Sequence, residues 1–447
     1  MQEPDLVGEL VYGSYQRVAD HLKGPDRETR DISLTDTLLR IQGISFDQWI
    51  CATVTGSKGK GSTAVLLARI LSASGNSIGL ITSPHLRNFR ERIRIDGKCV
   101  SEQQLHAAAV KLEPAVRQIE STLGPLNYLG PGGVILALAA TIFEEVGVSV
   151  VVIEAGRGGE YDEARCARAA ISVITPIMLE HPDKLGATVE EIARTKALIT
   201  FPGCPIISAP QPAPVEAVIA ETALELKSPL FMTSNFVRVM DRRETDTGFT
   251  YDLEVNGKKF SNLSIGLSGT HQVQNASSAI LAASKLESLG ATFLPDRIPN
   301  ALRDVRWPGR NQIIQSKPMV AVDGAINAES ARHACELAQS WGVRSIIAVV
   351  AVPAPKDLDG VCREVSRVAS QVILTEVATP NLQWYKEPLS IGQRYMKNVA
   401  YILDFNKAIS AALARSSNDS GLLLIGTQSF VGAVLERWDV DTCNLWP

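Results

Sequence analysis

The chain has 447 residues, of which 45% are hydrophobic and 21% are charged, a balance typical of a folded globular protein. Its formal net charge of −4 provides no basic face of the kind that binds nucleic acid, so we expect no nucleic-acid partner. A chain of this length predicts about two to three domains.

The cysteines and the N-terminus bear on where the protein works. Seven cysteines stand without metal-ligand spacing between any two, which predicts reduced thiols and a cytoplasmic location. Residues 1–6 lack the basic and apolar layout of a signal peptide. The strongest apolar run, residues 133–143, is too short to span a bilayer and predicts a buried helix, so we expect no membrane association.

Residues 1–45 are charged and have a helical repeat, so we expect a helical segment that packs on the following domain. Beyond them, apolar strands alternate with helical runs. The expected strands are 49–54, 77–82, 149–154 and 170–175, and the expected helices are 64–73, 102–123 and 134–145. Strands that are apolar throughout and separated by helices predict a parallel sheet covered on both faces, here a central α/β domain over residues 46–302.

Residues 231–267 alternate instead, and the turn sequences 246–248 and 256–257 predict a small antiparallel insert. Residues 271–289 return to a helical pattern. The segment 303–311 mixes proline, glycine and charge, and we expect it to be a linker. After it, the expected strands are 318–323, 345–352, 371–375 and 422–426, and the expected helices are 328–341 and 430–438. This pattern predicts a second α/β domain over 312–447, with ligands bound in the cleft between the two domains.

The most informative motif is the glycine-rich turn Gly56–Thr63, which follows an apolar strand and precedes a helical run. Glycines let backbone N–H groups converge on a phosphate, the helix N-terminus adds its positive end, and Lys60 adds a point charge. Either Ser62 or Thr63 can place a hydroxyl on Mg²⁺. The residues expected at the phosphates of a nucleoside triphosphate are Gly56, Ser57, Lys58, Gly59, Lys60, Gly61, Ser62 and Thr63.

Five other polar residues each allow two interpretations. Glu154 ends an apolar strand, where it either completes a Mg²⁺ site or faces solvent. His181 follows the next strand as a ligand or as a hydrogen-bonded structural histidine, and Lys196 lies on a short helix, where a solvated surface lysine is the ordinary interpretation. Asp323 at a strand tip suits a ribose hydroxyl or a helix N-cap. Arg310 is a linker charge or a contact of the γ-phosphate.

Eight motifs, in the same order and at similar separations, resemble those of folylpolyglutamate synthases and dihydrofolate synthases of the Mur ligase superfamily. They are Gly56–Thr63, Thr82–Leu86 with Glu91–Arg94, Glu154–Asp162, Leu179–His181 with Lys196, His271–Gln272 with Asn275–Ala276, Trp307–Arg310, Asp323–Ala325 and Gly426–Gly432. The resemblance covers about residues 50–432.

The resemblance implies a central ATPase domain with a phosphate loop, a Rossmann-like C-terminal domain, and catalysis in the cleft between them. It implies that ATP phosphorylates the carboxylate of a small-molecule acid, and that the amine of an amino acid, glutamate by the family's habit, attacks the acyl phosphate. The partners implied are therefore small molecules, and the chain is expected to act as a monomer or a weak oligomer.

The matching motifs also imply a role for each site residue. Lys60 holds the β- and γ-phosphates, Ser62 and Glu154 ligate one Mg²⁺, and His181 ligates a second. Lys196 matches a position that is often carbamylated in the family and then ligates metal, so the implied catalytic residues are Lys60, His181 and Lys196. The remaining matches are Asn275 on the adenine side, Arg310 at a phosphate, Asp323 at the ribose, and Ser83 and His85 near the acceptor and metal.

The sequence departs from the family pattern mainly on the substrate side. The departures are Ile326 for a histidine, Ala164-Arg165 for Thr-Asn, Glu180 for an aspartate, Thr195 for an acid, and Leu129-Gly130-Pro131-Gly132 for an aromatic–acid pair. They leave two alternatives to folate ligation. One is a repurposed Mur-type ligase that joins an amino acid or amine to a non-folate acid, and the other is an ATP-binding pseudo-enzyme.

Overall fold

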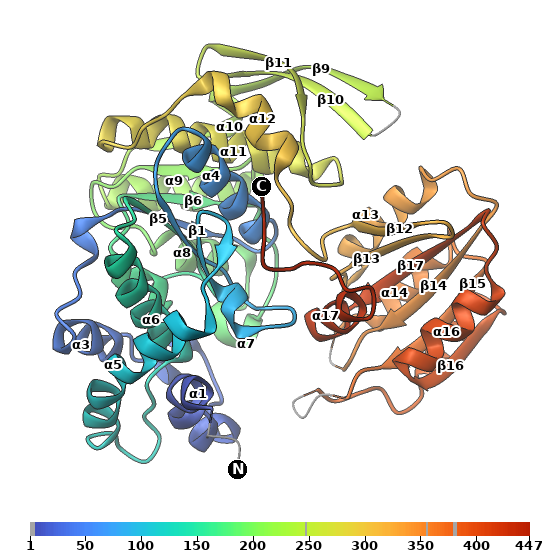
Figure 1. Ribbon diagram of the computed structural model, residues 1–447, viewed down its shortest axis with the longest axis horizontal. Coiled ribbons are helices and arrows are strands. Elements are labelled where there is room, and N and C mark those ends of the chain that lie inside the picture. The colour runs from blue at the N-terminus through green and yellow to red at the C-terminus, as the bar shows by residue number, and fades with distance from the viewer. Residues whose placement is uncertain (1–4, 246–247, 355, 379–381) are drawn as a thin grey trace.

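The computed structural model describes residues 5–245, 248–354, 356–378 and 382–447, which fold around one eight-stranded sheet and one six-stranded sheet (Figure 1). The strand order of the first sheet is β4-β3-β2-β5-β1-β6-β7-β8. Its strands are β1 (Ile50–Thr55), β2 (Ile78–Ile81), β3 (Ile93–Ile95), β4 (Lys98–Cys99), β5 (Val150–Glu154), β6 (Ile171–Ile174), β7 (Ile206–Ser208) and β8 (Leu230–Met232). All pairs are parallel except those that β3 makes with β2 and β4.

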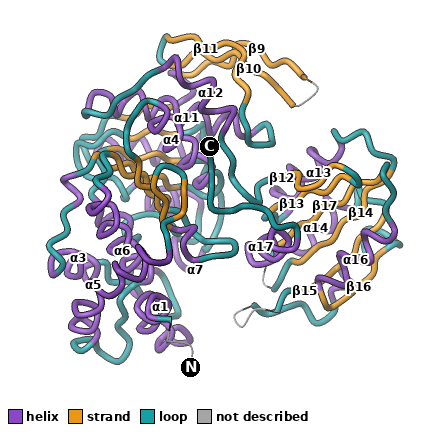
Figure 2. Tube along the Cα trace, viewed as in Figure 1, coloured by secondary structure: helices purple, strands orange, loops and turns teal. Residues whose placement is uncertain are grey.

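Helices cover both faces of this sheet, as Figure 2 shows. Val151 and Ile153 of β5 face one core with α1, α3, α5 and α6, whereas Val150 and Val152 face the other with α4 and α11. The helices are α1 (Leu6–Val18), α2 (Asp26–Thr29), α3 (Ser33–Ile41), α4 (Lys60–Ala73), α5 (Glu102–Glu120), α6 (Pro131–Val146), α7 (Pro182–Leu185), α8 (Val189–Ala197), α9 (Ala213–Glu225), α10 (Thr233–Phe236), α11 (His271–Leu286) and α12 (Ile298–Asp304). The expected parallel sheet, apolar on both faces, is confirmed.

The antiparallel insert is smaller than the alternating pattern predicts. It consists of β9 (Val237–Thr245), β10 (Gly248–Val255) and β11 (Lys258–Ser264), with the expected tight turn at Asn256-Gly257, where φ is 51° and 79°. Residues 246–247 of the other expected turn lie outside the described residues. The expected start at 231 is wrong, because Phe231 pairs in parallel with Ile207 as part of β8, and α10 follows.

The second sheet has the order β12-β13-β17-β14-β15-β16 and is parallel except for the edge strand β12. Its strands are β12 (Gln312–Ser316), β13 (Met319–Asp323), β14 (Ser345–Ala351), β15 (Gln371–Glu376), β16 (Val399–Asp404) and β17 (Ser420–Gly426). Its helices are α13 (Ala328–Gln339), α14 (Leu358–Val365), α15 (Pro388–Gln393), α16 (Phe405–Arg415) and α17 (Gln428–Arg437). The α/β class predicted for this part of the chain is confirmed.

The C-terminal residues return from α17 to the first sheet (Figure 1). Asn444 forms an antiparallel bridge with Lys98, and the Leu445 N–H donates to the Gly97 carbonyl at 3.0 Å. The Leu445 side chain is fully buried in the core that Val150 and Val152 share with α4 and α11. This segment therefore fastens the two α/β units together. We propose the domain boundary at 303–311, which covers the last two residues of α12 and the segment that leads to β12. In the described ranges no helix is long and apolar enough to cross a bilayer.

Candidate functional site

A cavity of about 850 Å³ lies between the two α/β units. The first unit contributes the phosphate loop, the end of β5 and the start of α11, and the second contributes the end of β13 and the start of α13. Because both parallel sheets direct strand ends and helix N-termini at this space, backbone dipoles and polar side chains converge there. We call this space the cleft.

The phosphate loop has the geometry that its sequence predicts. β1 ends at Thr55, the chain turns through Gly56 (φ 131°) and Gly59 (φ 85°), and α4 begins at Lys60. Lys60 Nζ donates to the Gly56 carbonyl at 2.8 Å, so the ammonium lies over the loop. Gly61 and Ser62 line the cleft, whereas Thr63 is fully buried. Ser62 is therefore the hydroxyl that can reach a cation.

Glu154 lies beside this loop because β5 pairs in parallel with β1, with Val54 opposite Glu154. The carboxylate accepts a hydrogen bond from the Ser83 N–H at 3.0 Å and is buried, so the solvent-facing interpretation is wrong. Burial raises the pKa of Glu154, and the charge of Lys60 opposes that rise. A buried carboxylate next to a phosphate loop is a suitable ligand for a hard cation.

Lys196 is completely buried, which contradicts the interpretation as a solvated surface lysine. Its Nζ donates to the carbonyls of Gly56 at 3.0 Å and Arg157 at 2.6 Å, and it pairs with Glu180 at 3.0 Å. Burial lowers the pKa of Lys196 to about 8, with Lys60 acting in the same direction. The lysine thus joins the phosphate loop to the segment after β5.

His181 follows β6 in a left-handed conformation (φ 46°) and precedes α7. Its exposed imidazole lines the cleft and makes no side-chain hydrogen bond to any residue that the structure describes. The interpretation as a hydrogen-bonded structural histidine is therefore not supported, and the ring is free to meet a ligand.

Asn275, Arg310 and Asp323 also line the cleft. Asn275 on α11 donates to Gln272 Oε1 at 2.9 Å and lies against Gly59, where an added Cβ would stand 2.5 Å from its Oδ1. Asp323 at the end of β13 accepts from the Asn311 N–H at 2.8 Å. The N-cap alternative is wrong, because Asn327 caps α13. The pKa of Asp323 is raised because the carboxylate is buried, and the nearby charge of Arg310 opposes part of that rise.

Ser83 and His85 are separated by the structure. Ser83 lines the cleft, and its Oγ accepts from Arg92 at 3.0 Å. His85 lies instead in a neighbouring hollow next to α1, where its Nδ1 accepts from Arg92 Nε at 2.8 Å. His85 therefore does not reach the cleft directly, because the loop turns away after Pro84 and places the imidazole behind the arginine.

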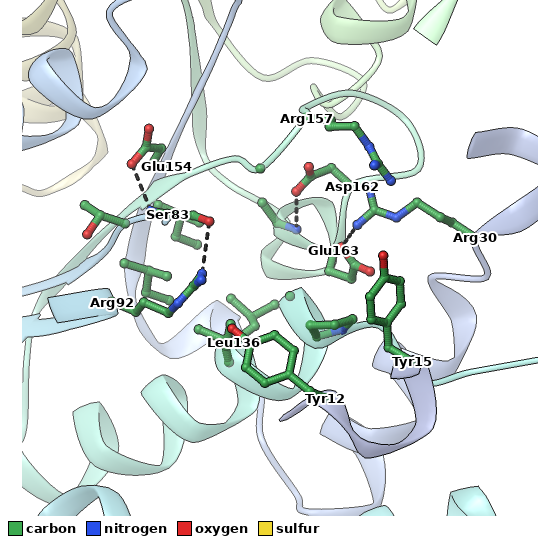
Figure 3. Close-up of a pocket in the computed structure, with 18 of the residues that line it drawn as sticks. Tyr12, Tyr15, Arg30, Ser83, Arg92, Leu136, Glu154, Arg157, Asp162 and Glu163 are labelled. Carbon is green, nitrogen blue, oxygen red and sulfur yellow. Dashed lines mark hydrogen bonds and ion pairs between the residues drawn. The ribbon is translucent and has the colours of Figure 1, made fainter. Parts of the chain in front are cut away.

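A second cavity of about 310 Å³ opens from the cleft at Ser83, Glu154, Gly156 and Arg157, which line both spaces. Tyr12, Tyr15 and Tyr128 form one part of its wall, and Arg30 and Glu163 form an ion pair in another (Figure 3). A second ion pair joins Arg157 to Asp26 at 2.9 Å. We call this space the acceptor cavity.

Sequence reasoning missed most of the acceptor cavity. Tyr12, Tyr15 and Arg30 lie in the N-terminal segment 1–45, and Tyr128 precedes α6. Neither stretch carries a motif. The one signal was the departure at Leu129–Gly132. An added Cβ at Gly132 would stand 2.8 Å from Glu163 Oε2, so the glycine leaves room for the Arg30–Glu163 pair.

The donor set around the phosphate loop fits magnesium. Mg²⁺ is usually held by one or two carboxylates together with waters and substrate phosphates. Glu154 and Ser62 supply a carboxylate and a hydroxyl beside the loop, and His181 faces the same space. Within the described ranges no cluster of three or more histidine, cysteine, aspartate or glutamate side chains forms a metal site by itself.

Comparison with known proteins agrees with this architecture. The Mur ligase middle domain matches residues 54–283, and the Mur ligase glutamate ligase domain matches residues 309–428. A dihydrofolate synthase/folylpolyglutamate synthase of Mycobacterium tuberculosis is 31% identical over 82% of this chain and 79% of that protein. The Bacillus subtilis protein of the same name is 27% identical over 86% of this chain and 89% of that protein.

The fold agrees as well. The structure of Mycobacterium tuberculosis folylpolyglutamate synthase complexed with ADP has a TM-score of 0.86 and 26% identity, and the match covers 98% of this chain and 100% of that chain. The resemblance inferred from the eight motifs is thereby confirmed. The chain belongs to the dihydrofolate synthase/folylpolyglutamate synthase family of Mur ligases.

Proposed function

We propose that the protein is an ATP-dependent ligase that joins glutamate to a folate-type carboxylic acid and releases ADP and phosphate. One observation carries this proposal: the phosphate loop and the acceptor cavity open onto each other at Ser83 and Glu154. A nucleotide in the cleft would therefore present its γ-phosphate to an acid bound in the cavity. The relatives, which are named for folate ligation, favour this acceptor over a non-folate acid.

In the first step a carboxylate oxygen of the acid attacks the γ-phosphorus, and the bond between that phosphorus and ADP breaks, so that ADP leaves with the electron pair. Such a transfer depends on positioning and on neutralisation of charge. Lys60 would bind the β- and γ-phosphates, and Arg310 would approach them from the second α/β unit. Asn275 would contact the adenine and Asp323 the ribose.

In the second step the glutamate amine attacks the acyl carbon, the carbon–oxygen bond to phosphate breaks, and phosphate departs with that electron pair. The amine loses its extra proton to solvent. Glu154 and Ser62 would hold one Mg²⁺ and His181 a second. Bound Mg²⁺ neutralises negative charge on the phosphates.

A carbamate on Lys196 is a further part of the proposal. With a pKa of about 8, a substantial share of Lys196 is the neutral amine that reacts with carbon dioxide. The three oxygens around Nζ suit an ammonium, so carbamylation requires the half-exposed Glu180 to turn away. Lys196→Ala should lose activity and regain part of it with added short carboxylates. Full activity without them would contradict a metal-ligating role.

The test of the function is product formation from dihydropteroate or tetrahydrofolate with glutamate and Mg-ATP, followed by mass spectrometry and ADP release. We expect one added glutamate per ADP. Lys60→Ala should abolish turnover. Lys397→Ala is the control and should not, because Lys397 is exposed and does not line the cleft. ATP binding without turnover of any acid would instead favour a pseudo-enzyme.

We also propose that the protein works in the cytoplasm, and that it is a monomer or weak oligomer. Light scattering can test the oligomeric state.

A further inference from the structure

One arginine that lines the acceptor cavity has no carboxylate partner among the residues that the structure describes. Arg92 ends the 3₁₀ turn Phe89–Arg92, lines the acceptor cavity, and directs its guanidinium toward Ser83 (Figure 3). Its Nε donates to His85 Nδ1 at 2.8 Å, and one Nη donates to Ser83 Oγ at 3.0 Å. Tyr12 lines the same cavity. Both hydrogen-bond partners of the guanidinium are neutral.

The other two arginines of the acceptor cavity differ from Arg92. Arg30 pairs with Glu163 and with Asp26, the latter at 3.5 Å, and Arg157 pairs with Asp26 at 2.9 Å. Among the described residues no carboxylate lies within ion-pair distance of Arg92. A half-buried guanidinium stays charged at every physiological pH, and a charge removed from water needs an opposite charge nearby.

The two acids whose charges act on Arg92, Glu154 and Glu91, are already engaged. Glu154 accepts the Ser83 N–H, and Glu91 accepts the backbone N–H groups of Leu86, Arg87 and Asn88. The anion that would balance Arg92 must therefore come from a ligand of the cavity.

The remaining donors of Arg92 match a carboxylate. A guanidinium has five N–H groups, and the two neutral partners occupy one each. Three N–H groups remain, all on the two Nη atoms, and a carboxylate needs two of them for a bidentate pair. The Nη atom that donates to Ser83 lies where the acceptor cavity meets the cleft.

We propose that Arg92 binds the reacting carboxylate of the acceptor acid at this junction. The inference rests on the proposed function for the identity of the acid, but not for the existence of the anion site. The guanidinium offsets the negative charge that would otherwise repel the γ-phosphate, and it directs one carboxylate oxygen toward the phosphate loop. Arg92 is thus a substrate-binding residue, and Ser83 and His85 position it.

The test compares benzoate with benzamide, two probes of equal shape that differ in charge. Their binding is measured by ligand-observed NMR with a non-hydrolysable ATP analogue occupying the cleft. Wild-type protein should bind benzoate about 10-fold or more tightly than benzamide. Arg92→Gln should abolish that preference by weakening benzoate alone, and Arg92→Lys should retain part of it. Arg90→Gln is the matched control, because Arg90 lies in the same turn but lines the hollow next to α1 and pairs with Glu102 at 3.7 Å.

Each result decides the proposal. Unchanged melting temperature and ATP-analogue affinity establish that the variants are folded. Loss of the benzoate preference in Arg92→Gln alone supports the carboxylate site. A preference that persists in Arg92→Gln, a wild-type protein without preference, or an equal loss of both probes would overturn it. Turnover of dihydropteroate is scored separately: an Arg92-dependent benzoate site in a protein that glutamylates no folate acid would contradict the proposed acceptor and leave the Arg92 site standing.

Discussion

The loop that carries Ser83 is held in place by one buried carboxylate, and its removal is the sharpest test of the site's architecture. Glu91 is 2% exposed. It accepts the backbone N–H groups of Leu86 at 2.7 Å, Arg87 at 3.0 Å and Asn88 at 3.0 Å, and the Thr442 hydroxyl at 2.8 Å. It therefore fixes the loop and also anchors the C-terminal segment that returns from the second α/β unit.

Glu91→Gln keeps the size of the side chain but removes its charge and turns one acceptor into a donor. The Leu86 N–H then faces an amide N–H, and the three remaining bonds lose their charge. Taking about 2 kcal/mol for the lost bond and about 1 kcal/mol for each of the three weakened ones, we expect a destabilisation of about 5 kcal/mol. For a domain of this size that corresponds to a fall of roughly 10 °C in the melting temperature.

Differential scanning calorimetry measures this fall, with Glu102→Gln as the control. Glu102 is 82% exposed and pairs with Arg90 at 3.7 Å, so its loss should cost less than about 1 kcal/mol. Ligase turnover of Glu91→Gln at a temperature where it remains folded should also fall, because the Ser83 loop loses its anchor. A melting temperature equal to that of wild type would refute the view that this carboxylate organises the loop.

Three further predictions concern the cleft. Gly59→Ala should raise the KM for ATP at least about 10-fold and leave the fold intact, because φ is 85° and the new Cβ would meet Asn275; an unchanged KM would show that the loop adapts. Burial and the charge of His333 lower the pKa of His271 to about 4, below the ordinary 6.5. The neutral ring therefore contributes stability that is present above pH 6.5. That stability, up to about 3 kcal/mol, is lost as the pH falls toward 4. His271→Gln should flatten the pH dependence of the melting temperature in that window, and an identical pH profile would count against this assignment. Ile326→His should change turnover little if the cleft is built around isoleucine, and a large gain would mark the natural enzyme as impaired.

Local sequence patterns predict the parts of the site that depend on neighbouring residues. The strand, glycine turn and helix around Lys60 follow from one stretch of sequence, and the parallel strands place Glu154 beside it. Burial of Lys196 was not predictable in this way. The helix Val189–Ala197 has the composition of a surface helix, and only the fold shows that Gly56 and Arg157 close over its lysine.

Long-range contacts explain the other misses. The return of Leu445 to the core beside α4 and α11 depends on partners far away in the chain. His85 looks like a cleft residue by its motif, but Arg92 lies between it and the cavity. Arg92 lies within the motif Glu91–Arg94, but the sequence alone predicts no role for it. Its lack of a carboxylate partner is a property of the folded cavity.

The central claim is that ATP activates the acid by phosphorylating its carboxylate at the junction between the acceptor cavity and the phosphate loop. The most direct test uses dihydropteroate labelled with ¹⁸O in its carboxyl group, together with glutamate and Mg-ATP, and follows the inorganic phosphate by mass spectrometry. Since the acyl–oxygen bond breaks when the amine attacks, the account predicts one ¹⁸O atom in each phosphate released. Amide product accompanied by unlabelled phosphate would contradict it.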